Sequence, residues 1–163
     1  MKAVQYVEHG GPEVLRVVDV AEPHAGPGQV RIEVKAVGVN PVDWKLRQGL
    51  LPSPLPRIPG SDVAGAVDEI GAGVSGVSLG DAVFGFTVGG GYARYAVLEH
   101  FAAKPAAMSF EEAAGVPVPA ETAVRVLDLL GVAAGDTLLI NAATGGVGTA
   151  AVQLARARGA RPP

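Results

Sequence analysis

The 163-residue sequence contains no cysteine. This absence excludes disulfides, thiolate zinc sites and cysteine nucleophiles, and it leaves the redox compartment open. A strong excess of one charge is also missing, because 13 basic and 16 acidic residues give a net charge of only −3. The basic residues are scattered along the sequence. Binding of nucleic acid or of an anionic membrane needs clustered positive charge, so neither partner is expected.

Long hydrophobic runs are also missing. Glu8 and His9 interrupt the amino-terminal segment before a long apolar run develops, and a signal peptide needs such a run. The most apolar helix candidate, around 117–134, contains Glu121, Arg125 and Asp128, which excludes a membrane span. We therefore expect a soluble, cytoplasmic protein.

Aromatic residues are few, at 5%, whereas the 23 glycines and 13 prolines are typical of a turn-rich β domain. Alternating or β-branched runs predict short antiparallel strands at 2–8, 14–20, 29–39, 62–70, 81–86 and 91–98. A partly open barrel or a sandwich fits this pattern. The four prolines between Pro52 and Pro59 exclude a helix and predict an extended loop.

The pattern changes after Lys104. Ser109 and Glu112 have the spacing of a capping box, which predicts a short helix towards Gly115. Apolar residues at helical spacing predict a second helix over 119–130, with Gly131 just beyond its end. The run 137–142 is apolar on both faces, as in a central parallel strand. A glycine turn at 145–148 follows, and then a predicted helix over 146–158.

A strand, a glycine turn and a helix N-terminus together form a binding place for a dinucleotide pyrophosphate, because unpaired backbone NH groups and the helix dipole converge there. Glycines also occur wherever a strand and a helix pack closely, so this turn alone is a weak signal. A nucleoside triphosphate loop needs a lysine after its last glycine, but Thr149 follows Gly148 and no lysine occurs beyond Lys104.

Several stretches together resemble the medium-chain dehydrogenase/reductase superfamily, and within it the zinc-free quinone oxidoreductase and enoyl reductase branch. The stretches that carry this resemblance are 38–45 (GVNPVDWK), 58–65 (IPGSDVAG), 80–83 (GDAV), 91–95 (GYARY) and 142–148 (AATGGVG). The resemblance implies a mainly β GroES-like barrel over 1–115. It also implies a linking helix and the start of an α/β Rossmann domain over 116–163.

Zinc members of this superfamily have a cysteine where Asn40 stands, and a histidine and a glutamate where Ser61 and Asp62 stand. Amide and hydroxyl groups are poor zinc ligands, and the four-cysteine structural zinc loop is missing too. The three histidines are dispersed along the sequence. We predict no metal.

Without zinc to polarise a carbonyl, the expected chemistry is hydride transfer from a reduced nicotinamide to a quinone or a conjugated enone. The resemblance implies that Asn40, Asp43, Trp44 and Arg47 line the cleft beside the nicotinamide. Two structural alternatives remain open: Asp43 caps or tethers a short helix, and Trp44 fills the barrel core. Tyr92 and Tyr95 are weaker candidates, as proton donors, and the alternative for both is a plain position on a sheet face.

The cofactor implied by the resemblance is NADPH. The residues assigned to its binding are Thr122, Ala142, Gly145, Gly146, Val147 and Gly148. Thr122 is equally compatible with a plain position on a helix face.

Members of the superfamily continue for about as many residues again, so we expect this chain to be an amino-terminal fragment that is inactive alone. Strand 137–142 and helix 146–158 would then lack cover, which favours self-association or a complementing chain. The alternative function is a noncatalytic GroES-like module that associates with a partner. A zinc alcohol dehydrogenase is disfavoured by Asn40 and Ser61.

Overall fold

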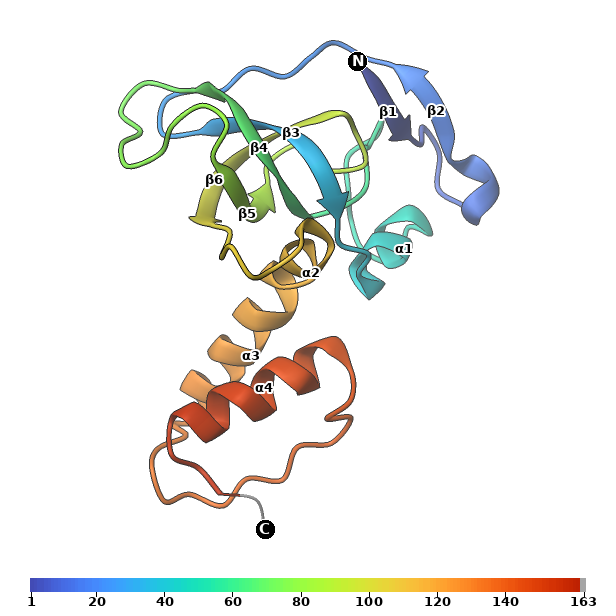
Figure 1. Ribbon diagram of the computed structural model, residues 1–163. Helices are drawn as coiled ribbons and strands as arrows, with labels where there is room; N and C mark the ends of the chain where they lie inside the picture. Colours follow the sequence, from blue (N-terminus) through green and yellow to red (C-terminus); the bar gives the residue numbers. More distant parts are fainter. Residues whose placement is uncertain (162–163) are drawn as a thin grey trace. The chain divides into compact units, whose positions relative to one another are not determined.

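A computed structural model describes residues 1–161. These residues form two compact units, one spanning Met1–Gly115 and the other beginning at Val116. The first unit is built around a closed antiparallel barrel (Figure 1). Its strands are β3 (Val30–Val37), β4 (Asp62–Ile70), β5 (Ala82–Thr87) and β6 (Tyr95–Ala103).

The barrel closes because β3 pairs with both β4 and β6, so neither edge of the sheet is left open. Of the two sequence alternatives, the barrel is therefore the observed one. A separate antiparallel pair is formed by β1 (Lys2–Gln5) and β2 (Arg16–Asp19), which are connected through the short 3₁₀ helix η1 (Pro12–Val14).

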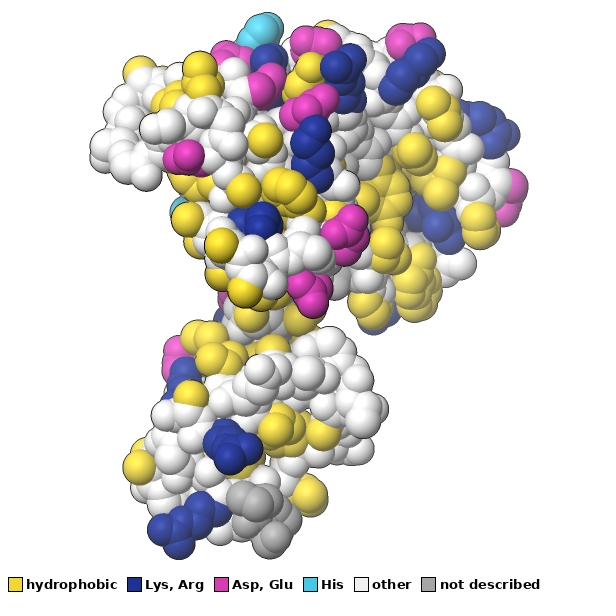
Figure 2. Space-filling model, viewed as in Figure 1, with side chains coloured by type: hydrophobic (Ala, Val, Ile, Leu, Met, Phe, Trp, Pro, Cys, Tyr) yellow, Lys and Arg dark blue, Asp and Glu magenta, His cyan; other side chains and the backbone are white. Residues whose placement is uncertain are grey.

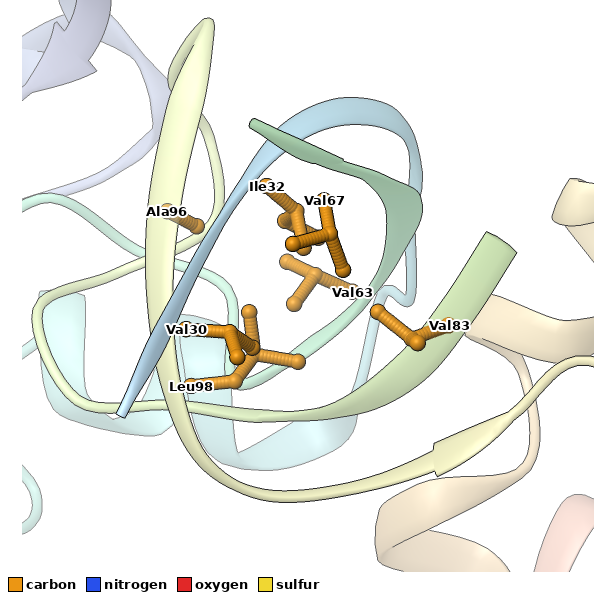
Figure 3. Packing of buried hydrophobic residues seen from close by; sticks show 7 residues of the cluster. All are labelled: Val30, Ile32, Val63, Val67, Val83, Ala96 and Leu98. Atoms are coloured by element: carbon orange, nitrogen blue, oxygen red, sulfur yellow. The ribbon is translucent and has the colours of Figure 1, made fainter. Parts of the chain in front are cut away.

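The core of the first unit is a cluster of aliphatic side chains inside the barrel. Figure 3 shows them converging from all four strands. They are Val30, Ile32, Val63, Val67, Val83, Ala96 and Leu98. Burial of each larger member contributes about 1.5–3 kcal/mol to folding. No ring is part of this cluster, which agrees with the low aromatic content.

Two helices are attached to the barrel: α1 (Pro41–Arg47) follows β3, and α2 (Phe110–Ala114) follows β6. The capping box predicted for α2 is confirmed. Glu112 donates its backbone NH to Ser109 Oγ at 3.1 Å, and its carboxylate accepts the Ser109 NH at 2.8 Å. Ala113 and Ala114 then pack against Ala64 of β4, which fixes α2 on the outside of the barrel.

The second unit consists mainly of α3 (Pro117–Leu129) and α4 (Gly146–Ala157), which pack on each other. Pro117, Ala123 and Leu127 of α3 and Ala155 of α4 are among its buried side chains. Gly131 lies just beyond the end of α3, as predicted, and its φ of +65° is the left-handed conformation common at that position. No helix within residues 1–161 is long and apolar enough to cross a membrane.

The predicted strand 137–142 is not formed. Its residues make one isolated parallel bridge, from Thr137 to Arg161. Arg161 NH donates to the Asp136 carbonyl at 2.8 Å, and Leu138 NH donates to the Arg161 carbonyl at 3.2 Å. A strand is defined by pairing, and within residues 1–161 nothing else pairs with 138–142. Leu139 consequently remains 83% exposed.

The last strand of the barrel lies further along the chain than predicted, at Tyr95–Ala103 instead of 91–98. Residues 91–94 serve as an irregular connection. Gly91 NH donates to the carbonyls of Pro59 and Gly60 at 3.0 and 2.8 Å, and Ala93 NH donates to the Gly91 carbonyl at 2.7 Å. Because Gly91 bonds to Pro59 and Gly60, this segment is not paired in the barrel. The hydrophobic periodicity of the sequence did not indicate these long-range hydrogen bonds.

The surface charges of the first unit are mixed. On the face shown in Figure 2, basic side chains alternate with acidic ones. Arg31, for example, lies beside Asp68 and Glu69 at 2.8 and 3.0 Å.

Candidate active site

The candidate site is positioned by the connection between β3 and α1. At Gly38 a Cβ atom would lie 2.5 Å from the Ala114 carbonyl oxygen and 2.8 Å from Asp62 Cβ. Only glycine permits this close approach. The chain therefore leaves the barrel directly beside the start of β4, and this path carries Asn40 towards Asp62.

Asn40 and Asp62 form a buried hydrogen bond. The Asn40 side-chain amide donates to Asp62 Oδ2 at 2.9 Å. Asp62 is fully buried and Asn40 is 9% exposed. A buried carboxylate needs such donors, because leaving it unpaired would cost several kcal/mol, on the order of 3–5.

Asp43 joins the start of α1 to the loop before β4. Its Oδ2 accepts the Asn40 backbone NH at 2.8 Å, and its Oδ1 accepts the Gly60 NH at 3.2 Å. The first contact satisfies one of the donors left open at a helix N-terminus. Asp43 thus has the tethering arrangement, which was one of the two alternatives left open for it.

Arg47 and Trp44 differ in their surroundings. Arg47 Nε donates to the Gly10 carbonyl at 3.2 Å, so this guanidinium holds the amino-terminal loop against α1. Trp44 is 42% exposed and is absent from the buried cluster of the barrel. The interpretation that Trp44 fills the barrel core is therefore wrong. Trp44 lies on an outward face of α1, because aliphatic side chains already fill the interior of the barrel.

The four predicted catalytic residues do come together. Asn40, Asp43, Trp44 and Arg47 line one small cavity with Tyr92, and its volume is about 80 Å³. Ligand pockets for small molecules usually measure about 300–1,000 Å³, so this cavity by itself does not enclose a quinone. It offers an edge of polar groups beside which a ring could lie.

The sequence did not indicate that Leu15 also lines this cavity. Leu15 follows η1, and only the folded chain brings it beside α1. No motif or spacing in the sequence marks it.

Tyr92 faces this cavity in its neutral form. Burial raises the pKa of the Tyr92 phenol above its ordinary value, the negative charge of Asp43 raises it further, and the positive charge of Arg47 lowers it. A phenol that keeps its proton remains a hydrogen-bond donor at neutral pH.

The positions occupied by zinc ligands in related zinc enzymes do not fit a zinc ion here. They hold the amide of Asn40, the hydroxyl of Ser61 and the carboxylate of Asp62, which is already bonded to Asn40. Zinc prefers thiolate, imidazole and carboxylate in a tetrahedral set. Within residues 1–161, no group of three or more metal-binding side chains is gathered elsewhere.

The glycine turn of the second unit precedes α4 and has the geometry of an anion-binding helix N-terminus. Gly145 is the N-cap residue of α4, and within residues 1–161 no side chain forms a cap hydrogen bond there. The NH groups of Gly146, Val147 and Gly148 occupy that turn, where no intrahelical acceptor is available. Ala142 has φ +56°, a left-handed conformation that starts the turn.

Gly148 is required for close packing within the turn. A Cβ atom there would lie 2.2 Å from the Ala142 carbonyl oxygen. At Gly145 the same atom would lie at an ordinary 3.5 Å. A side chain is therefore tolerated at Gly145 but not at Gly148, where the backbone of the turn approaches most closely.

Five of the six predicted cofactor residues line one cavity of about 490 Å³ in the second unit: Ala142, Gly145, Gly146, Val147 and Gly148. Thr122 is half-buried on α3 and is not among the lining residues. The turn residues from Ala142 to Gly148 fit the pyrophosphate part of a dinucleotide. They supply backbone NH donors at a helix N-terminus beside a cavity, and none of them carries a negative charge.

Comparison with known proteins identifies the family. The alcohol dehydrogenase GroES-like domain matches residues 26–107, which is half of the chain. The chain belongs to the medium-chain dehydrogenase/reductase superfamily. The match contains β3 to β6 and the connection that carries Asn40. The second unit adds the partial start of a Rossmann domain.

Similar proteins include quinone oxidoreductases and a 2-methylene-furan-3-one reductase. Over 98% of its length the chain is 44% identical to human quinone oxidoreductase and spans 50% of it. It is 39% identical to the 2-methylene-furan-3-one reductase of Solanum lycopersicum, covering 96% of the chain and 44% of that protein. The structure of Escherichia coli quinone oxidoreductase complexed with NADPH matches 99% of the chain and 51% of that protein, with TM-score 0.86 and 34% identity. The chain thus spans about half the length of these relatives.

Proposed function

We propose that this chain is the GroES-like part of an oxidoreductase that transfers a hydride from NADPH to a quinone or a conjugated enone without a metal ion. Membership of the superfamily supports an oxidoreductase. The names of the relatives support the acceptor class, since one is a quinone oxidoreductase and another reduces a conjugated methylene-furanone.

The observation that carries the proposal is the hydrogen bond between Asn40 and Asp62. It occupies the positions at which zinc enzymes polarise an alcohol or carbonyl, and it replaces their ligands by an amide that is held in place. A site without a Lewis acid suits acceptors that are already activated by conjugation. This observation favours a quinone or enone over a simple ketone.

The residues of the chain have separate roles in this reaction. The NH groups of Gly146 and Val147 bind the pyrophosphate, and Gly148 lets the helix approach it closely. NADPH, if held there, would supply the hydride. Asp62 fixes the orientation of the Asn40 amide, which has a second NH for an acceptor oxygen. Asp43 holds the start of α1, at Asn40, close to the loop that contains Gly60, because its carboxylate accepts a backbone NH from each.

Dinucleotide sites are built from two halves of a Rossmann domain, whereas this chain presents one glycine turn. We therefore expect the 163-residue chain by itself to bind NADPH weakly and to be inactive. The proposed activity belongs to the protein in which this domain is joined to a complete nucleotide-binding domain.

The experiment follows NADPH oxidation by a protein in which this chain is joined to a complete nucleotide-binding domain, with 1,4-benzoquinone and with trans-2-hexenal as acceptors. We expect oxidation with at least one acceptor and no effect of EDTA. Failure with both acceptors in a folded, NADPH-binding protein would refute the proposal. Loss of activity with EDTA and its recovery with zinc would refute the metal-free mechanism.

A second candidate function is that of a noncatalytic module that associates with another chain. It is favoured by exposed apolar side chains in the second unit, where Leu139 is 83%, Val152 43% and Val147 40% exposed. Such a surface invites association. Light scattering after size-exclusion chromatography tests this function. A monomer at all concentrations, with no binding of a hydrophobic dye, would exclude it.

A further inference from the structure

His9 has no part in the roles assigned above, yet its ring lies at the carboxyl end of α1. The carbonyl of Arg47, the last residue of α1, accepts the Gly10 NH at 3.0 Å and is 3.3 Å from His9 Nδ1. A carbonyl oxygen can only accept, so the proton must lie on Nδ1. A carbonyl in the last turn of a helix has no helical NH left to bond it. Two donors from the amino-terminal segment therefore supply what α1 lacks at this end.

The side chain of Arg47 bonds back to the same segment. Its Nε donates to the Gly10 carbonyl at 3.2 Å, so Arg47 shares three hydrogen bonds with His9 and Gly10. With Nε engaged, the two terminal nitrogens are the donors that Arg47 can offer to the cavity that it lines. Within residues 1–161 these terminal nitrogens form no hydrogen bond or ion pair. Their position consequently depends on how firmly the amino-terminal loop holds the end of α1.

The ring of His9 lies on well-fixed neighbours. Its centroid is 6.4 Å from that of Tyr6, a fully buried side chain, and this distance is usual for aromatic pairs. Tyr6 in turn exchanges two backbone hydrogen bonds with Arg57, at 3.0 and 2.9 Å. At Gly49, which has φ +76°, a Cβ atom would lie 3.1 Å from Cγ of the His9 ring. The ring therefore has a defined place although His9 is exposed.

The segment that begins at His9 also reaches the candidate cavity directly. Leu15 lies in the wall of this cavity, together with Trp44 and Arg47 of α1. Residues 9–15 are thus tied to the site at both ends, through the hydrogen bonds to Arg47 and through Leu15. Loosening the segment at His9 would move the donors of Arg47 as well as lower the stability of the fold.

We propose that His9 is a positioning residue of the candidate active site. Its Nδ1–H holds the carboxyl end of α1 and thereby keeps the terminal nitrogens of Arg47 at the cavity. The effect on catalysis rests on the function proposed above, because the hydride acceptor is the ligand that Arg47 would meet there. The effect on the position of Arg47 does not depend on that function.

Solvent exchange of the Arg47 Nε–H proton, followed by heteronuclear NMR in the 163-residue chain, tests the effect on position. The signal is identified by its loss in Arg47→Lys. We expect exchange to be about threefold to tenfold faster in His9→Ala, as for the loss of one hydrogen bond. His9→Asn carries an amide NH where Nδ1 stands, so its exchange rate should return to within about twofold of the wild type. His9→Gln carries its amide further out and should resemble His9→Ala.

The effect on catalysis is measured in a protein in which this chain is joined to a complete nucleotide-binding domain. We expect His9→Ala to raise the KM for 1,4-benzoquinone about threefold or more, and His9→Asn to restore it. The KM for NADPH should not change, because the glycine turn lies in the other unit. A role confined to stability would reduce the amount of active enzyme and hence the apparent kcat, and would leave both KM values unchanged.

His24→Ala is the matched control, because it removes a histidine whose Nδ1 bonds to Glu69 elsewhere in the first unit. Circular dichroism establishes that each variant is folded, and His9→Gln replaces His9→Ala if the latter fails to fold. The proposal is overturned by unchanged Arg47 exchange in the folded variant, by failure of His9→Asn to restore it, or by an equal change in His24→Ala.

The two measurements separate this proposal from the proposed function. If the wild-type joined protein oxidises no NADPH, the proposed function fails, and the exchange rates alone decide whether His9 positions Arg47. Faster exchange in His9→Ala with an unchanged KM for 1,4-benzoquinone, in a joined protein that is active, would overturn the role of His9 in catalysis.

Discussion

The side-chain amide of Asn40 donates a hydrogen bond to the carboxylate of Asp62 at 2.9 Å, and both residues are buried beside α1. Each residue supplies the hydrogen-bond partner that the other requires. The carboxylate needs a donor because it is shielded from water, and the amide needs a fixed partner in order to present its remaining NH in one direction.

Replacing Asn40 by alanine should destabilise the protein. Asp62 would lose one donor in a fully buried position, at a cost of about 1–3 kcal/mol. Urea unfolding measures the loss, and Gln48→Ala on the exposed end of α1 serves as the control. An Asn40→Ala variant as stable as the wild type would show that the hydrogen bond contributes nothing to folding.

Zinc should not bind stoichiometrically. The protein is dialysed against zinc and then against buffer, and its metal content is measured by mass spectrometry. We expect less than one zinc per chain because the amide and hydroxyl groups of Asn40 and Ser61 are poor ligands. One equivalent of zinc that survives dialysis would contradict this reading of the donor set.

Gly148→Ala should disturb the turn before α4. The added Cβ would lie 2.2 Å from the Ala142 carbonyl oxygen, so the backbone must move, at a cost of about 1–3 kcal/mol. Gly145→Ala is the matched control, because its Cβ would lie at 3.5 Å. Hydrogen exchange of the α4 amides should be faster only in Gly148→Ala. Equal exchange in both variants would refute the packing argument.

Tyr92 should make the stability of the protein fall at alkaline pH. Its pKa is raised in the folded state from 10.0, so above pH 10.0 the unfolded chain loses this proton first and unfolding becomes easier. Burial is the main cause, followed by the charge of Asp43. The phenolate absorbance gives the titration, and Tyr92→Phe should remove this part of the pH dependence. A Tyr92 pKa at or below 10.0 would contradict the assignment.

The fluorescence of Trp44, the one tryptophan of the chain, should report an exposed side chain. With 42% of its surface exposed, we expect red-shifted emission and efficient quenching by acrylamide in the folded protein. Denaturant should shift the emission little. Blue-shifted emission that acrylamide fails to quench would place the ring in a core after all.

Local signals predicted much of the fold. The spacing of Ser109 and Glu112 predicted a capping box, and the observed hydrogen bonds form it. Gly131 lies just beyond the end of α3, as predicted. Both features depend on residues that are close in the chain, so the sequence pattern contains all the information needed to predict them.

Features that depend on a distant partner were predicted less well. The apolar run 137–142 has the composition of a central strand, but a strand forms only where another chain segment pairs with it. The observed strand β6 begins later in the chain than predicted, because Gly91 bonds to Pro59 and Gly60, which are far away in sequence. The residues assigned to catalysis and to cofactor binding remain predictions.

By itself the sequence determined the types of chemistry available: no thiolate and a glycine turn before a helix. The family resemblance added that an amide and a hydroxyl stand at the positions of metal ligands. Only the tertiary structure decided that Asn40 bonds to Asp62, that Asp43 tethers Gly60, and that Trp44 lies outside the core. The physical reason is that burial and hydrogen bonding are set by neighbours in space. Closure of the barrel brings these neighbours together from distant parts of the chain.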